Sequence, residues 1–241
     1  MTDLILALDQ GTTSSRSILF TEKAEIRAVA SEPLECRFPD SGWVEQDAEA
    51  IWETQRSTIV KVLDQAGIGL SEVSAIGITN QRESTIAWNR ETGEALCPAI
   101  NWQCRRTAGF CDELKEEGFD ELIRNRTGLV TDPYFSGTKM HWILQNVPEA
   151  ANLALHGKLC FGTVDSWLIW KLSGGTTHAI EISNASRTLV FDIQKCEWDS
   201  EILARFGIPP ESLPEVVPSS GVIAEIDESL FGGSAPIAGA A

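Results

Sequence analysis

The sequence has 241 residues, of which 43% are hydrophobic, enough for one large domain or two small ones with a buried core. Lys and Arg total 19 against 35 Asp and Glu, a formal net charge of −16 at pH 7. Because nucleic acids are bound through clustered positive charge, this balance argues against a nucleic-acid partner. An anionic nucleotide would then need a locally basic pocket, for which the candidates are Arg16, Arg82, Arg105, Arg106 and Lys139.

The distribution of apolar residues and cysteines indicates the compartment. No apolar stretch approaches the roughly 20 residues of a membrane-spanning helix, and the N-terminus enters an apolar segment without a basic leader, so we expect no membrane insertion. The six cysteines include no Cys-x-x-Cys pair. Their scatter predicts free thiols in a reducing environment, and hence a cytoplasmic protein without a disulfide framework or a zinc site.

The first segment is an apolar run, residues 4–8, that ends in Asp9 and is followed by Gly11, four hydroxyl residues at 12–15 and a second apolar run at 17–20. This pattern predicts a strand, a turn and a strand. The glycine lets a ligand approach the backbone, and the hydroxyls beside free amides suit phosphate oxygens. Asp9 would repel a phosphate, so a role for it implies a bridging Mg²⁺. A hydroxyl-rich hairpin tip without a ligand explains these residues alone equally well.

The next segments predict a meander, a helix and a buried strand. Residues 26–34 form a third strand after a short turn, which gives an antiparallel meander. A helix is expected from the N-cap Asp47 to Gly67, because apolar residues recur between them at the helical period. The strand at 73–79 ends in the polar segment 80–83, which we expect at the edge of a cleft.

The second half predicts helices interleaved with short strands. A hairpin of 85–88 with 95–100 leads into helices at 104–117 and 119–126, and a further helix starts at 132–136 and stops near Pro148. Residues 161–165 pass from strand to helix, and residues 199–206 form a short helix. Together these elements predict an α/β fold with a mixed sheet and flanking helices. Neither a dinucleotide-binding glycine motif nor a P-loop is present.

Six sequence motifs are weak evidence for a protein family one by one, but they are specific in combination. They include Asp-Gln-Gly-Thr-Thr-Ser-Ser-Arg at 9–16, Gly-Ile-Thr-Asn-Gln-Arg-Glu at 77–83, Trp-Gln-Cys-Arg-Arg at 102–106 and Asp-Pro-Tyr-Phe-Ser-Gly-Thr-Lys at 132–139, with further segments at 161–172 and 184–188. In this order they closely resemble the FGGY carbohydrate kinases, and among them the glycerol kinases, over nearly the whole chain. The resemblance implies a ribonuclease H-like fold, as in actin, hexokinase and the Hsp70 ATPase, with residues 1–241 as the N-terminal domain.

The resemblance also implies a nucleotide site at the first turn. It assigns phosphate binding to Thr12, Thr13, Ser14 and Arg16, and it places Asp9 on the Mg²⁺ side. ATP and Mg²⁺ are the implied nucleotide and metal.

The implied polyol site uses residues from three other motifs. Arg82, Glu83 and Tyr134 would hold the hydroxyls of glycerol, since a carboxylate accepts, a guanidinium donates and a phenol does either. Trp102 would lie against the carbon backbone. Without the surrounding motifs, Arg82 and Glu83 could equally form an exposed ion pair, and Tyr134 could be a core residue. Arg187 matches a family position that we interpret as structural or supporting.

The implied activity is ATP-dependent phosphorylation of glycerol to sn-glycerol 3-phosphate, by a protein that is a homo-oligomer at full length. The family's catalytic Asp and C-terminal domain would lie beyond Ala241, so we expect no catalytic base within residues 1–241 and no activity from them alone. One alternative is an FGGY kinase for a pentulose or gluconate, which Arg82 and Glu83 disfavour. Another is an actin-like or Hsp70-like ATPase module, which would need no sugar site.

Overall fold

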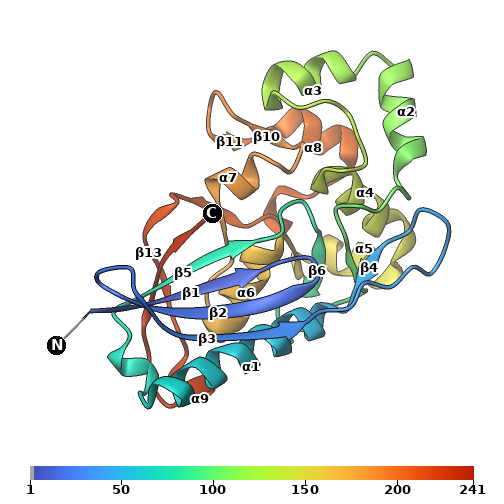
Figure 1. Ribbon diagram of the computed structural model, residues 1–241. Coiled ribbons are helices and arrows are strands. Elements are labelled where there is room, and N and C mark those ends of the chain that lie inside the picture. Colours follow the sequence, from blue (N-terminus) through green and yellow to red (C-terminus); the bar gives the residue numbers. More distant parts are fainter. Residues whose placement is uncertain (1–2) are drawn as a thin grey trace.

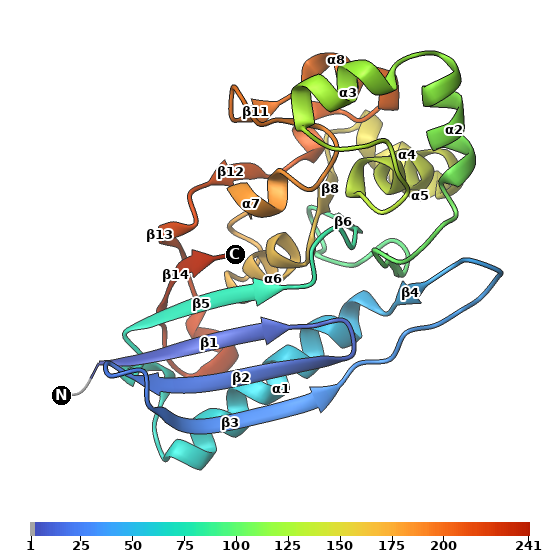
Figure 2. The same cartoon turned by 45° about the horizontal axis from the view of Figure 1, so that its top comes forward.

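The computed structural model describes residues 3–241, and its centre is a six-stranded mixed sheet with the order β13-β14-β5-β1-β2-β3 (Figure 2). The three N-terminal strands form the predicted antiparallel meander, while β5 runs parallel to both β1 and β14. The predicted mixed sheet is therefore confirmed. Its strands are β1 (Leu4–Gln10), β2 (Ser14–Thr21), β3 (Ile26–Pro33), β5 (Ala75–Asn80), β13 (Ser220–Glu225) and β14 (Pro236–Ala240).

Helix α1 (Ala48–Ala66) has the capping residues that the sequence indicates at both ends. The Asp47 side chain accepts hydrogen bonds from the backbone amides of Glu49 and Ala50, at 3.0 and 3.3 Å. Gly67 ends the helix in the left-handed conformation, at φ 67°, where a residue without Cβ is favoured. The predicted helix is confirmed at both boundaries.

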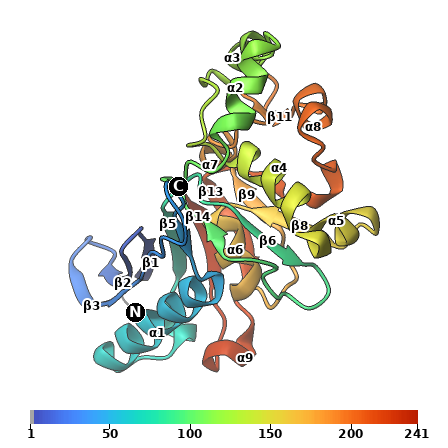
Figure 3. The ribbon, with the colours of Figure 1, turned by 90° about the vertical axis from the view of Figure 1, so that its right-hand side faces the viewer.

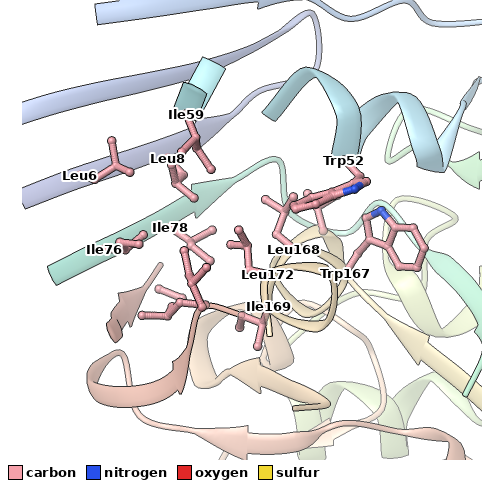
Figure 4. Close-up of a cluster of buried hydrophobic side chains, with 14 of the residues drawn as sticks. Leu6, Leu8, Trp52, Ile59, Ile76, Ile78, Trp167, Leu168, Ile169 and Leu172 are labelled. Atoms are coloured by element: carbon pink, nitrogen blue, oxygen red, sulfur yellow. The ribbon is translucent and has the colours of Figure 1, made fainter. Parts of the chain in front are cut away.

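The main core lies between one face of the sheet and two helices, α1 and α6 (Val164–Leu172) (Figure 4). Alternate side chains of the parallel strands, Leu6 and Leu8 on β1 and Ile76 and Ile78 on β5, point to this face and are at most 3% exposed. Complete burial of such a side chain stabilises the fold by about 1.5–3 kcal/mol. The packing holds the carboxyl ends of β1 and β5 in fixed register.

A second core lies beyond those carboxyl ends, where α2, α3, α4 and α8 gather (Figures 1 and 3). Strands β6 and β8 pair antiparallel and lead from the sheet into this region. No helix among residues 3–241 has the length and apolarity to cross a bilayer. The helices are α2 (Ala108–Glu116), α3 (Asp120–Thr127), α4 (Ser136–Asn146), α5 (Pro148–Leu155), α7 (Ile182–Ala185), α8 (Ser200–Phe206) and α9 (Glu228–Phe231). The short strand pairs are β4 (Glu45–Gln46) with β7 (Ala99–Ile100), β6 (Ile86–Asn89) with β8 (Leu159–Gly162), β9 (Ala179–Glu181) with β12 (Glu215–Val217), and β10 (Phe191–Asp192) with β11 (Glu197–Trp198).

Several boundaries differ from the sequence predictions, and two of them show why. The expected hairpin of 85–88 with 95–100 is joined by two isolated bridges and by hydrogen bonds such as that from the Leu96 amide to the Ala87 carbonyl, and β6 pairs in addition with β8. The helix expected from 132–136 begins only at Ser136, because the Asp132 side chain accepts the backbone amide of Tyr134 at 2.9 Å and fixes a turn there. Both differences arise from contacts that periodicity does not reveal.

Candidate active site

The hydroxyl turn joins β1 to β2 at the edge of the sheet, as the sequence predicts. The amide of Gly11 donates to the carbonyl of Ser14 at 2.9 Å and closes the turn. Asp9 and Arg16 are cross-strand partners, with Oδ2 and Nη1 3.9 Å apart and both side chains almost half exposed. An exposed pair of this kind contributes at most about 1 kcal/mol, so both groups are free to meet other ions.

The backbone carbonyl groups of this turn accept hydrogen bonds from other segments of the domain. The Thr12 carbonyl accepts from Nε2 of Gln46 at 2.8 Å, and the Thr13 carbonyl accepts from the amide of Leu34 at 2.9 Å. The Thr13 side chain is exposed, and that of Thr12 is partly exposed. The turn therefore keeps a fixed backbone while the residues Thr12, Thr13 and Ser14 stay at least partly exposed; the Ser15 hydroxyl is buried against Thr54.

Trp102 connects the hydroxyl turn with Tyr134. Its indole Nε1 donates to Oγ1 of Thr12 at 2.9 Å, and its ring meets the Tyr134 ring edge-on, with centroids 5.5 Å apart. Both aromatic residues are partly exposed. Residues predicted for phosphate and for polyol thus lie side by side, although Trp102 and Thr12 are 90 positions apart in the sequence.

Glu83 is buried, at 3% exposure, in a left-handed backbone conformation with φ 64°. Its Oε1 accepts from Nε of Arg187 at 2.7 Å, and its carbonyl accepts from the Ser136 hydroxyl at 3.1 Å. A non-glycine residue with positive φ stores strain of order 1 kcal/mol or more, which persists where the surroundings fix it, often at functional sites. The alternative of an exposed ion pair between Arg82 and Glu83 is wrong, because the partner of Glu83 is Arg187.

Arg82 itself is exposed beside this carboxylate segment. Within residues 3–241 its side chain forms neither an ion pair nor a hydrogen bond. Its guanidinium is free to donate to a ligand.

A buried network of side-chain amides lies beneath the site, and the sequence did not reveal it. Asn101 Nδ2 donates to Oε1 of Gln46 at 2.9 Å and to Oε1 of Gln81 at 3.1 Å. The Ser84 hydroxyl donates to Oε1 of Gln81 at 3.1 Å and accepts the backbone amide of Trp102 at the same distance. Through Gln46 and the Thr12 carbonyl, this network ties the hydroxyl turn to the aromatic pair. The sequence signal was that Gln81 lies within the motif at 77–83 and that Asn101 directly precedes the motif at 102–106.

Not all five candidates for a basic pocket are available to a ligand. Arg106 is buried against Glu45 at 2.7 Å and stacks on the ring of Trp43 at 3.8 Å. Arg105 pairs with Asp132 at 3.2 Å. The Arg106 guanidinium is thus matched by a carboxylate in the interior and organises a loop, whereas Arg105 forms an exposed ion pair.

Lys139 is also not part of an open pocket, because its side chain is completely buried. Its Nζ donates to the carbonyls of Tyr134 and Phe135 at 2.6 and 3.0 Å. Burial lowers the pKa of Lys139 to about 7, and the negative charges of Glu83 and Asp132 oppose that shift. A neutral amine has two N–H donors, and two carbonyls satisfy both.

Residues 4–241 match the model of the FGGY family of carbohydrate kinases, N-terminal domain, and the chain belongs to this family. Curated relatives include glycerol kinases. The chain is 54% identical over 237 residues to that of Koribacter versatilis and 51% identical over 242 residues to that of Bacillus subtilis, covering 98% and 100% of this chain. It spans about half the length of these relatives, 48% and 49%.

Solved structures show the same fold. The glycerol kinase of Plasmodium falciparum with ADP superposes with a TM-score of 0.91 at 30% identity, over 99% of this chain and 48% of that one. The xylulose kinase of Rhodospirillum rubrum superposes with a TM-score of 0.87 at 24% identity, over 99% of this chain and 48% of that one. At this identity the similarity shows the fold alone. The expected actin- and hexokinase-like fold is confirmed.

Proposed function

We propose that these residues form the N-terminal domain of a glycerol kinase, which transfers the γ-phosphoryl group of ATP to glycerol and yields sn-glycerol 3-phosphate. The observation that carries the proposal is the contact of Trp102 with both Thr12 and Tyr134, because it makes the phosphate and polyol residues one continuous surface. The relatives at 50–54% identity, glycerol kinases by name, support this substrate.

The polyol side offers matched donors and acceptors for a small neutral molecule. Glu83 has one carboxylate oxygen, Oε2, that accepts no hydrogen bond within residues 3–241 and can accept from a hydroxyl. Arg82 donates to hydroxyls, and Tyr134 donates or accepts. The ring of Trp102 suits the carbon chain. A site whose buried polar groups pair with substrate hydroxyls discriminates strongly against molecules without them.

The nucleotide side uses the turn. Thr12, Thr13, Ser14 and Arg16 bind phosphate oxygens through hydroxyls, amides and the guanidinium. Asp9 suits Mg²⁺, which takes one or two carboxylates together with phosphates and waters. No cluster of three or more His, Cys, Asp or Glu that could hold a metal occurs within residues 3–241. When bound, Mg²⁺ neutralises charge on the phosphates.

Catalysis then depends on positioning and on a base for the attacking hydroxyl. Among buried carboxylates near the site, Asp165 accepts from the Thr163 hydroxyl and from the amide of Glu181, so both its oxygens are occupied. Oε1 of Glu83 is held by Arg187. On the family resemblance, we place the base on an aspartate outside residues 1–241, in a C-terminal domain that closes over the nucleotide. The six free cysteines support a cytoplasmic location, and a homo-oligomer follows from the family alone.

Product identification tests the proposal. The product of the complete reading frame is incubated with ATP, Mg²⁺ and glycerol, and sn-glycerol 3-phosphate is measured by its stereospecific enzymatic oxidation. Formation of this product in step with ADP is the expected result. ADP release that does not depend on glycerol would contradict the proposal and favour an ATPase module.

A further inference from the structure

We propose that Arg187 is a positioning residue of the polyol site, holding one oxygen of the Glu83 carboxylate so that the other faces the substrate. The inference rests on the proposed function. Arg187 follows helix α7, and its Nε lies 2.7 Å from Oε1 of Glu83. The arginine side chain is 31% exposed and that of the glutamate 4%, so a partly exposed cation pairs with a buried carboxylate.

A buried carboxylate needs a partner that fixes its charge and its rotation. An unpaired buried ion costs several kcal/mol, and a charge-assisted hydrogen bond to a guanidinium offsets that cost with a defined direction. Since Oε1 is occupied and Oε2 is not, the contact with Arg187 presents a single acceptor to a hydroxyl. The cation also offsets the repulsion that a lone carboxylate would exert on an approaching phosphoryl group.

Arg187 is itself held firmly. Its guanidinium carbon lies 4.9 Å from the ring centroid of Phe135 and 5.8 Å from that of Tyr134. The next residue, Thr188, accepts the amide of Gly137 through its carbonyl at 2.6 Å. A Cβ on Gly137 would lie 2.7 Å from that carbonyl oxygen, so glycine permits the close approach. The segments that carry Arg187, Glu83 and Tyr134 therefore meet at one packed junction.

A double-mutant cycle between Arg187 and Glu83 tests the inference in the product of the complete reading frame. Arg187→Gln is expected to lower kcat/KM for glycerol by about tenfold or more and to leave the KM for ATP within about twofold. If Arg187 acts through Glu83, the same change in a Glu83→Gln background lowers kcat/KM by less than about threefold, because coupled residues are not additive. Arg126→Gln, which removes a contact to Asp192 in the same domain, is the matched control and should change neither constant.

The outcomes separate this inference from the proposed function. Wild-type protein without glycerol kinase activity would refute the function itself. If the wild type is active, two results would overturn the role of Arg187. One is an equal fall in kcat/KM for glycerol from Arg187→Gln in the wild-type and Glu83→Gln backgrounds. The other is an effect of Arg187→Gln mainly on the KM for ATP. Should Arg187→Gln fail to fold, Arg187→Lys decides by the same criteria, since its ammonium cannot reproduce the Nε contact.

Discussion

Glu83 combines burial, a left-handed backbone and a carboxylate oxygen free for a hydroxyl. Glu83→Gln replaces that acceptor with an amide while the shape of the side chain stays nearly constant. We expect it to raise the glycerol KM and to lower kcat/KM by at least ~1.4 kcal/mol, which is tenfold. Steady-state kinetics with glycerol as the varied substrate measure the effect, and unchanged constants would remove Glu83 from the site.

Trp102 offers a second test, because its indole N–H reaches the phosphate turn while its ring faces Tyr134. Trp102→Phe keeps an aromatic face and removes the donor to Thr12. We expect the KM for ATP to rise about three- to tenfold, the value of a hydrogen bond of about 1 kcal/mol. Trp198→Phe is the matched control, since that indole donates to the carbonyl of Pro214 away from the site. Equal effects from both variants would show that the Thr12 contact has no special role.

The motifs predicted which residues gather at the site, but not how each is held. Glu83 and Arg187 are 104 positions apart, and only the folded chain shows that they pair. The amides of Gln46 and Asn101 were missed because nothing in a sequence marks which neutral polar side chains become buried and bonded. The burial of Lys139 was not predictable either, because lysine is ordinarily exposed and nothing in the sequence marks this exception.

At the scale of elements, local signals fixed some boundaries and tertiary contacts fixed others. Helix α1 was predictable because its caps and its period lie within the segment itself. Helix α4 starts later than predicted because a side chain four residues upstream, Asp132, holds a turn. Strand β6 also pairs with β8, which lies about 70 residues further along the chain, and no local sequence pattern predicts this pairing.

The start of α4 also gives a prediction about packing. Gly137→Ala would place a methyl group 2.7 Å from the Thr188 carbonyl oxygen and 2.8 Å from Cγ1 of Val190. We expect this overpacking to destabilise the protein by about 1–3 kcal/mol and to raise the glycerol KM by displacing the segment that carries Tyr134. Urea unfolding and glycerol kinetics measure the two effects.

Gly109→Ala is the control for that substitution. Gly109 lies inside helix α2, and an added Cβ there meets nothing within 4 Å. Because alanine is the better helix former, this change should stabilise the protein by about 0.5–1 kcal/mol and leave kinetics unchanged. Destabilisation by both substitutions would contradict the argument from close approach at Thr188.

At the scale of the whole molecule, the buried Lys139 makes stability depend on pH. Its pKa in the folded protein is about 7, below the ordinary 10.5, so between these values the unfolded chain binds more protons than the folded one. The free energy of unfolding therefore rises with pH in this window, by up to about 1.4 kcal/mol per pH unit. Lys139→Met removes this contribution. The free energy of unfolding of the wild type should therefore rise relative to that of the variant between pH 7 and 9.

Urea unfolding at several pH values checks this prediction. Burial raises the pKa values of Cys97 and Cys111 from 9.0 to about 11 and 12, which lowers the stability of both wild type and Lys139→Met above pH 9 and cancels in the difference between them. Lys115→Met, at an exposed lysine, is the control, and its free energy of unfolding should change with pH in the same way as that of the wild type. Parallel curves for wild type and Lys139→Met would mean that the buried amine does not titrate in this range.

The substrate of the whole molecule is the central claim, and relative acceptor rates test it most directly. With the product of the complete reading frame and saturating ATP, kcat/KM is measured for glycerol, xylulose and gluconate through coupled ADP release. The proposed polyol residues Glu83, Tyr134 and Trp102 predict that glycerol exceeds both sugars by at least about 100-fold in kcat/KM, since unpaired buried polar groups penalise the wrong substrate. Faster turnover of xylulose or gluconate than of glycerol would contradict the account.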